Sequence, residues 1–301
     1  MSRSPLKRYG GWLSLLRPPN LLTVPGDPIA GAMLAVLGGA EFSFLYMLPT
    51  VGAALLLYMG GLIGNDCFDY REDAKTRPTR PLPSGSVSRR SAMVAAVVFT
   101  LAGIGVASSA GLPACIVSVL LATAVWSYNG LTKKFSFLGS LNMGICRGLS
   151  LLLGATGVGW MPRDPDVVLI GCVGLILYVG AVTLLAERET EQVRIPIRRW
   201  LPAAVNLVTM GSIVLLSGSW NYAFILLAAS AVAWPIVLGV RLGIAPPPAG
   251  IVPSIGGFIR GLLLLQAAFS ALLWPTGAVV ACVILLAWPV NVYLARQFYA
   301  S

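Results

Sequence analysis

The stretch that decides the fold is residues 44–73, FLYMLPTVGAALLLYMGGLIGNDCFDYRED, in which a long apolar run ends in a group of acids. Asp66, Asp69 and Asp73 follow one another at spacings of three and four residues, so a helix places them on one face. Carboxylates at the mouth of a membrane helix repel one another and lose hydration unless a cation joins them. The stretch therefore predicts a membrane helix whose end binds a cation.

The composition of the whole chain is typical of a membrane protein. Of its 301 residues, 57% are hydrophobic and only 11% are charged, which does not fit a soluble domain of this length. Apolar segments long enough to cross a bilayer recur along the sequence. We expect an all-α, polytopic transmembrane bundle that forms one domain over residues 1–301. Its expected spans lie near residues 20–39, 44–66, 91–109, 112–130, 138–158, 167–186, 199–217, 221–240, 256–274 and 276–295.

The net charge of +10 could suggest a nucleic-acid partner. Nearly all of the basic residues, however, fall in the short connections that alternate spans leave on one side of the membrane, as the positive-inside rule requires. Contact with anionic lipid explains most of this excess, so the partner that we expect is the lipid bilayer and not nucleic acid. The same distribution predicts a multi-pass protein of the inner cell membrane with its N-terminus and its acid-bearing ends on the cytoplasmic side.

A second acid cluster, AERETE at residues 186–191, ends a later span on the same predicted side. Glu187 and Glu191 share one helical face and Glu189 points away, so we expect the first two to matter more. Carboxylates are the hard oxygen ligands that Mg²⁺ prefers. The sequence therefore predicts an Mg²⁺ site whose metal-binding and catalytic residues are Asp66, Asp69, Asp73, Glu187 and Glu191.

Basic and amide side chains close to these two boxes offer partners for a phosphate group carried by a lipid. We expect substrate-binding roles for Asn65, Arg80, Lys133, Lys134 and Arg194. For Lys134 and Arg194, an ordinary position in a positively charged loop is an equally good interpretation.

Four further residues are candidates for the substrate site. Arg147 is a strongly charged residue inside a predicted span, where arginine normally faces a polar cavity or an acidic partner. It could bind an acidic group of an acceptor, or pair with an acid of the boxes. Arg17 could contact substrate or anchor the first span at the interface. Tyr128 and Trp126 could stabilise a carbocation through their ring faces, or serve as interfacial belt residues.

These residues also carry a family resemblance. The string Asn65-Asp66-x-x-Asp69-x-x-x-Asp73, followed by RPLPSG at 80–85, resembles the signature of the UbiA-type intramembrane prenyltransferases. Tyr128 with the lysine pair after it, and RPPN at 17–20, are similar to further motifs of that family. The resemblance covers roughly residues 15–275.

The resemblance implies the UbiA-like fold and a transferase reaction. Two acid boxes would hold Mg²⁺ on an allylic polyprenyl diphosphate, and the prenyl group would pass to a hydrophobic or aromatic acceptor with release of diphosphate. Lys133 best matches the lysine of the family. The chain departs from the family in having glutamates in the second box, where aspartates are usual. It also has ten predicted spans, where nine are typical.

Two other functions stay open at this stage. A carrier would bind a phosphorylated isoprenoid lipid without chemistry, although signals of a broken helix near the bilayer centre are weak. A non-catalytic member of the family would have lost activity when its second box changed. Release of inorganic diphosphate distinguishes the enzyme from both.

Overall fold

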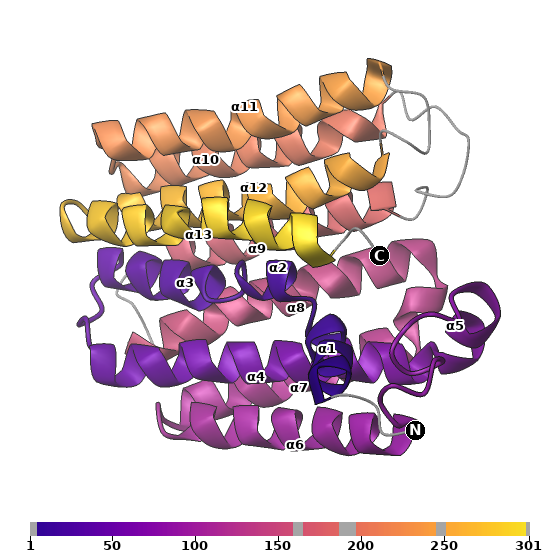
Figure 1. Ribbon diagram of the computed structural model, residues 1–301. Coiled ribbons are helices and arrows are strands. Elements are labelled where there is room, and N and C mark those ends of the chain that lie inside the picture. Colours follow the sequence, from indigo (N-terminus) through magenta and orange to yellow (C-terminus); the bar gives the residue numbers. More distant parts are fainter. Residues whose placement is uncertain (1–4, 159–164, 187–196, 245–250, 299–301) are drawn as a thin grey trace.

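The computed structural model describes residues 5–158, 165–186, 197–244 and 251–298, and this part of the chain is helical, with no strand. The all-α prediction is confirmed. The helices, labelled in Figure 1, are α1 (Pro5–Leu16), α2 (Pro18–Leu21), α3 (Gly26–Leu37), α4 (Phe44–Phe68), α5 (Tyr70–Thr76), α6 (Arg89–Ser108), α7 (Leu112–Gly130), η1 (Thr132–Lys134), α8 (Ser136–Val158), α9 (Asp166–Ala186), η2 (Arg198–Trp200), α10 (Leu201–Ser217), α11 (Tyr222–Ile244), α12 (Ile251–Ala271) and α13 (Thr276–Phe298).

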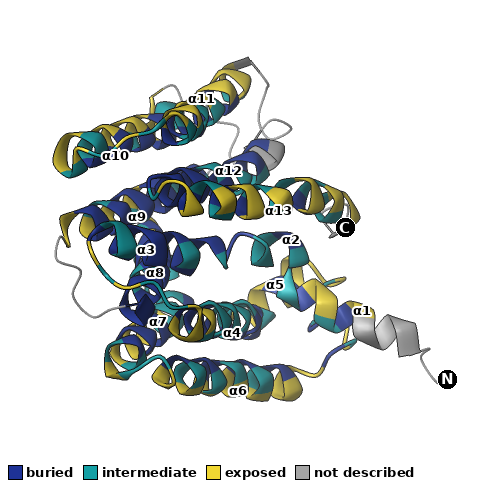
Figure 2. Ribbon diagram, turned by 90° about the vertical axis from the view of Figure 1, so that its left-hand side faces the viewer, coloured by how far each residue is buried: buried dark blue, intermediate teal, exposed yellow. Residues whose placement is uncertain are grey.

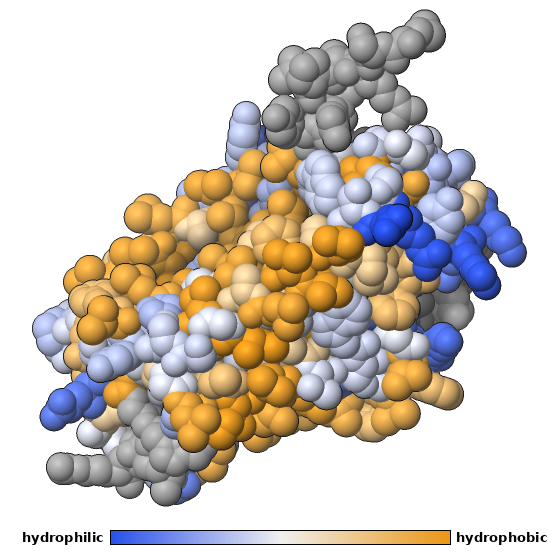
Figure 3. Space-filling view, turned by 90° about the horizontal axis from the view of Figure 1, so that it is seen from below, coloured by the Kyte–Doolittle hydropathy of each residue, from blue (hydrophilic) through white to orange (hydrophobic). Residues whose placement is uncertain are grey.

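Ten helical segments of the described chain are long and apolar enough to cross a membrane, and they match the ten predicted spans within a few residues. Large apolar side chains such as Leu45, Leu101 and Leu226 are exposed on them. Figure 3 shows a broad apolar surface on one face of the bundle, with the most hydrophilic side chains near its two ends. An exposed apolar belt of this kind faces lipid, so the protein is a multi-pass membrane protein.

Helices α3 and α8 lie in the middle of the bundle (Figures 1 and 2). On one side α8 packs against α7 and, less extensively, α4, and α6 packs against α4. On the other side α8 packs against α9, and α3 packs against α12. The helices between α9 and α13 bury one large apolar cluster with α3 and α8. Two smaller clusters lie on the side of α4, α6 and α7. The central pair therefore joins the two sides of the bundle.

The first span is broken between α2 and α3. Helix α2 ends at Leu21 and α3 begins at Gly26, so residues 22–25 interrupt the predicted span 20–39. Pro25 and Pro28 flank the start of α3, and neither can donate a backbone hydrogen bond. The interruption exposes the carbonyl of Thr23 to partners from other helices.

Small residues let several helices approach closely. Gly144 and Gly148 of α8 face Ile176 of α9, and Gly60 of α4 faces the backbone of α6. In lipid, where both environments are apolar, such close van der Waals contact is a main source of helix association.

Candidate functional site

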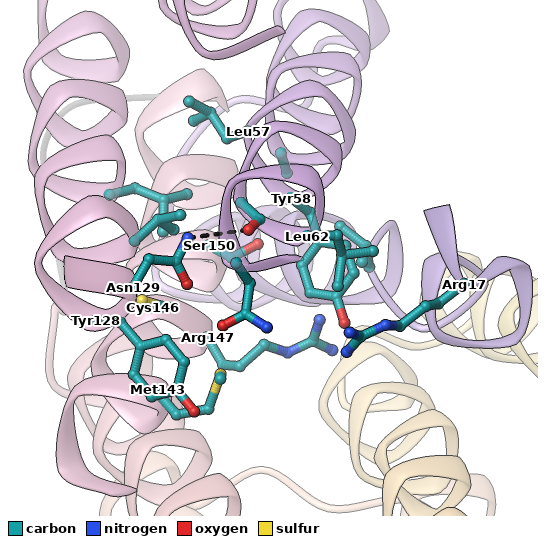
Figure 4. A pocket seen from close by; sticks show the side chains of 16 residues that line it. Arg17, Leu57, Tyr58, Leu62, Tyr128, Asn129, Met143, Cys146, Arg147 and Ser150 are labelled. Carbon is teal, nitrogen blue, oxygen red and sulfur yellow. Dashed lines mark hydrogen bonds between the residues drawn. The ribbon is translucent and has the colours of Figure 1, made fainter. Parts of the chain in front are cut away.

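A cavity of about 160 Å³ lies among α4, α7 and α8 (Figure 4). Its lining follows α4 from Ala54 to Asn65, which at 1.5 Å per residue corresponds to about 16 Å along the helix. Much of the wall is apolar, with Val24, Ala54, Leu57, Leu121, Val125 and Met143. Polar groups lie toward the end where α4 meets its acid box, among them Arg17, Asn65, Tyr128 and Asn129.

Each aspartate of the first box is paired with a cation from a different part of the chain. Arg17 Nη2 donates to Asp66 Oδ1 at 2.6 Å. Arg80 Nη1 lies 2.9 and 2.8 Å from the two oxygens of Asp73. Both aspartates are buried, and a buried carboxylate is stable only with a partner of this kind.

The third pair joins two helical ends that are far apart in the sequence. Lys133 Nζ, on η1, contacts Asp69 Oδ1 and lies 3.4 Å from Asn65 Oδ1. The lysine that best matches the resemblance is therefore brought to the acid box, together with Asn65. Arg17, Arg80 and Lys133 are the predicted substrate-binding cations that the fold gathers at this mouth.

The backbone of Arg17 is in the left-handed region, with φ 45° and ψ 66°. No other non-glycine residue in the described part of the chain has a positive φ. Such a conformation costs about 1–3 kcal/mol and persists where the surroundings enforce it. Pro18, which follows directly, disfavours the helical conformation for Arg17. In this conformation the guanidinium of Arg17 pairs with Asp66.

The acids do not lie on one continuous helix, which corrects the sequence interpretation. Helix α4 ends at Phe68 and α5 begins at Tyr70, with Asp69 between them. The turns continue through the junction, because the amide of Asp69 donates to the carbonyl of Asn65 at 3.0 Å and that of Asp73 to the carbonyl of Asp69 at 2.9 Å. The box is thus a bent segment with its carboxylates on successive turns.

The chemistry of these donors fits Mg²⁺ as a partial ligand set. Asn65 lines the cavity, and the carboxylates of Asp66, Asp69 and Asp73 follow it on the next turns of the chain. Among the described residues no three acids, cysteines or histidines gather into a ready-made metal cluster. Mg²⁺ usually takes only one or two carboxylates, with phosphate oxygens of the substrate and water completing its shell.

The structure places the remaining predicted residues differently. Tyr128 lines the cavity (Figure 4). Trp126 does not: its indole N–H donates to Thr100 Oγ1 at 3.1 Å, and its ring packs edge-on against Phe68, so its described contacts are structural. Lys134 is exposed. Glu187, Glu191, Glu189 and Arg194 lie outside the described residues.

Arg147 has a partner that sequence reasoning missed. Its Nε lies 2.9 Å from Asp27 Oδ2, and the Asp27 side chain is wholly buried. Among the described residues, Arg147 therefore pairs with Asp27 and not with an acid of the first box. Asp27 stands in the first turn of α3, where the helix dipole favours a negative charge. A lone Asp inside an apolar predicted span was the available signal.

The same ion pair lies at the break in the first span, where side chains donate hydrogen bonds to the free backbone carbonyl of Thr23. Arg147 Nη2 donates to the carbonyl of Thr23 at 3.0 Å, and Gln266 Nε2, from α12, donates to that carbonyl at 2.8 Å and to Asp27 Oδ1 at 2.6 Å. Backbone groups freed within a membrane need such partners. Gly26 makes room for the amide of Gln266, which a Cβ at that position would overlap.

We expect Asp27→Ala to lower the free energy of unfolding by about 3–5 kcal/mol, because it leaves the Arg147 charge buried without its partner. Replacing both residues by apolar ones, Asp27→Leu with Arg147→Met, is expected to restore most of that stability. Thermal unfolding in detergent measures both effects. Glu72→Ala, on the exposed face of α5, is the control. Equal melting of Asp27→Ala and the wild type would contradict the assignment.

The fold and site together define a polytopic membrane protein with an apolar cavity and an ionic mouth. The sequence profile of the UbiA prenyltransferase family matches residues 28–267, and the chain belongs to this family.

Three known proteins illustrate the relationship. The chain is 35% identical over 156 residues to the digeranylgeranylglyceryl phosphate synthase of Methanopyrus kandleri, a match that covers 50% of this chain and about half (54%) of that relative. The fold resembles a UbiA homologue from Aeropyrum pernix, with a TM-score of 0.67, 17% identity and coverage of 82% and 96% of the two chains. A UbiA homologue from Archaeoglobus fulgidus bound to DMAPP and Mg²⁺ gives a TM-score of 0.59, 12% identity and coverage of 87% and 99%.

Proposed function

We propose that this protein is an Mg²⁺-dependent prenyltransferase. It would move a polyprenyl group from an allylic diphosphate to a lipophilic acceptor and release diphosphate. The observation that carries the proposal is the set of three carboxylate–cation pairs that directly follows the part of α4 lining an apolar cavity. The family, the name of the synthase from Methanopyrus kandleri and the DMAPP and Mg²⁺ bound to the homologue from Archaeoglobus fulgidus support it.

The carboxylates and the cations of the three ion pairs would have different roles. Asp66, Asp69 and Asp73 would hold Mg²⁺, which when bound neutralises charge on the leaving diphosphate. Arg80 and Lys133, now paired with carboxylates, are placed to exchange those partners for diphosphate oxygens. The apolar wall would hold the prenyl segment and keep water from the allylic carbon.

We further propose that Glu187 and Glu191 form the second acid box and bind Mg²⁺, and that Glu189 contributes less to metal binding. Glutamate offers the same oxygen chemistry as aspartate with a longer reach, so it suits the same metal. The distribution of basic residues supports a cytoplasmic position for the mouth, because Arg80, Arg89 and Lys133 all lie at its end of the bundle.

The decisive experiment measures release of inorganic diphosphate by the purified protein with a panel of prenyl diphosphates. Release is expected only with Mg²⁺, and chelation by EDTA should abolish it. Asp66→Ala and Asp73→Ala should lose release as well. Binding of the lipid without any release would favour the carrier or the non-catalytic alternative, and normal turnover in EDTA would exclude the metal role.

The apolar end of the cavity predicts a steric effect on the prenyl donor. A cavity of this volume holds about one benzene ring, so Ala54→Phe should fill it. We expect the kcat/KM for prenyl diphosphates to fall on the order of 10- to 100-fold. Leu56→Phe is the matched control, because Leu56 is not part of the cavity lining. Equal kinetics of the two variants would show that the donor binds elsewhere.

A further inference from the structure

We infer that Asp27 and Arg147 form a charge-balanced anchor for an uncharged oxygen of the acceptor, such as a hydroxyl group. The inference rests on the proposed function, since it names the chemical class that this wall of the cavity recognises. It concerns the acceptor and is independent of how the diphosphate is held.

The guanidinium of Arg147 has donors that the protein leaves unused. It carries five N–H groups and remains protonated in proteins. Nε faces Asp27 in the ion pair, and Nη2 donates to Thr23. For Nη1 the described residues supply no acceptor. This nitrogen is not closed off from solvent, so in the wall of the cavity that Arg147 lines it can donate to a ligand oxygen.

The position of the pair directs these donors into the cavity. Arg147 lines it, whereas Asp27 does not, so the carboxylate stands behind the guanidinium. Ser150 lies one helical turn beyond Arg147 and lines the same wall. Figure 4 shows the Arg147 side chain extending across the cavity toward Arg17. The side chain is buried, and its contacts with Asp27 and with the carbonyl of Thr23 hold the guanidinium in this orientation.

The charge of Asp27 decides which oxygen fits. A free arginine selects carboxylate or phosphate, which it binds through parallel N–H groups. Here a buried carboxylate already balances the guanidinium, and it would repel a second anion at close range in a medium of low dielectric constant. Arg17, the other arginine of the lining, is likewise paired, with Asp66. The anchor therefore favours a neutral acceptor oxygen over an anionic one.

Lipid binding tests this inference without the transfer reaction. The probes are a monoalkylglycerol and the phosphate monoester of the same monoalkylglycerol, added to the full chain in detergent without Mg²⁺ or prenyl diphosphate. Native mass spectrometry gives the two dissociation constants. Asp27→Asn should shift the ratio of the two affinities toward the phosphate by about tenfold or more relative to the wild type. An unchanged ratio in folded Asp27→Asn protein would overturn the inference.

The double variant Asp27→Leu with Arg147→Met decides the question if Asp27→Asn does not fold. It removes the pair without leaving a buried charge, and its affinity for the neutral monoalkylglycerol should fall about tenfold. Undiminished affinity would again reject the anchor. Arg260→Met is the matched control, since Arg260 is an arginine of α12 that bonds to Asn291 outside the cavity lining. Diphosphate release is measured separately, so failure of the anchor and failure of the proposed reaction give different results.

Discussion

Asp69→Asn is expected to lower the kcat/KM for prenyl transfer by about a thousandfold, through loss of charge at the centre of the acid box. Asp69 lies between α4 and α5, and its carboxylate contacts Lys133, so it connects the metal-binding and diphosphate-binding sides of the proposed site. Asparagine keeps the size of the side chain and its oxygen but removes the negative charge. The measurement is steady-state transfer from a radiolabelled prenyl diphosphate over a range of Mg²⁺ concentrations.

The control for this prediction is Glu72→Gln, which removes the same charge from a neighbouring, exposed position. We expect its kinetics to match the wild type within about a factor of two, since exposed charges contribute little. A comparable loss in Glu72→Gln would mean that net charge alone matters. Full activity of Asp69→Asn would remove the first box from the mechanism.

Gly154→Ala should destabilise the protein by about 3 kcal/mol or more, because it forces apart the two central helices. A Cβ at Gly154, on α8, would overlap the carbonyl group and Cα of Pro28 on α3. On the opposite side of the contact, Gly31 faces the carbonyl of Leu151 in the same way. Backbone atoms cannot turn aside as a flexible side chain can, so the helices themselves must separate.

Thermal unfolding in detergent, followed by size-exclusion chromatography, measures this effect. Gly105→Ala is the control, since within the described structure no atom lies within 4 Å of the Cβ that it adds on α6. We expect Gly105→Ala to melt at the wild-type temperature or slightly above it, because alanine favours helix. A wild-type melting temperature for Gly154→Ala would show that α3 and α8 can move apart at little cost.

The acid mouth illustrates what local sequence predicts well. Asp66, Asp69 and Asp73 ended an apolar run at helical spacing, and the structure has them on successive turns after Asn65, which lines the cavity. Hydropathy and helical period are properties of neighbouring residues, so they locate spans and their ends. The bend at Asp69 lay beyond this reasoning, because helix boundaries depend on packing around them. The role of Glu187 and Glu191 is still a prediction.

Asp27 and Arg147 illustrate the opposite case. They are 120 positions apart in the sequence, and neither carries a local pattern that names the other. Arg147 was expected to bind an acidic group of an acceptor or an acid of the boxes, and its partner Asp27 became clear only once α3 and α8 were neighbours. The glycines that permit this approach, Gly31 and Gly154, likewise meet partners from another helix.

By itself, the sequence determined a membrane-spanning all-helical chain and an acid box with Asn65 at the end of its second span, because apolar length and helical spacing are local. Only the tertiary structure decided that the first span breaks before Gly26, that Asp27 and Gln266 hold Arg147 there, and that Lys133 reaches Asp69. The physical reason is that buried charges and freed backbone groups take whichever partner the packed bundle brings within reach, and that partner can come from any helix.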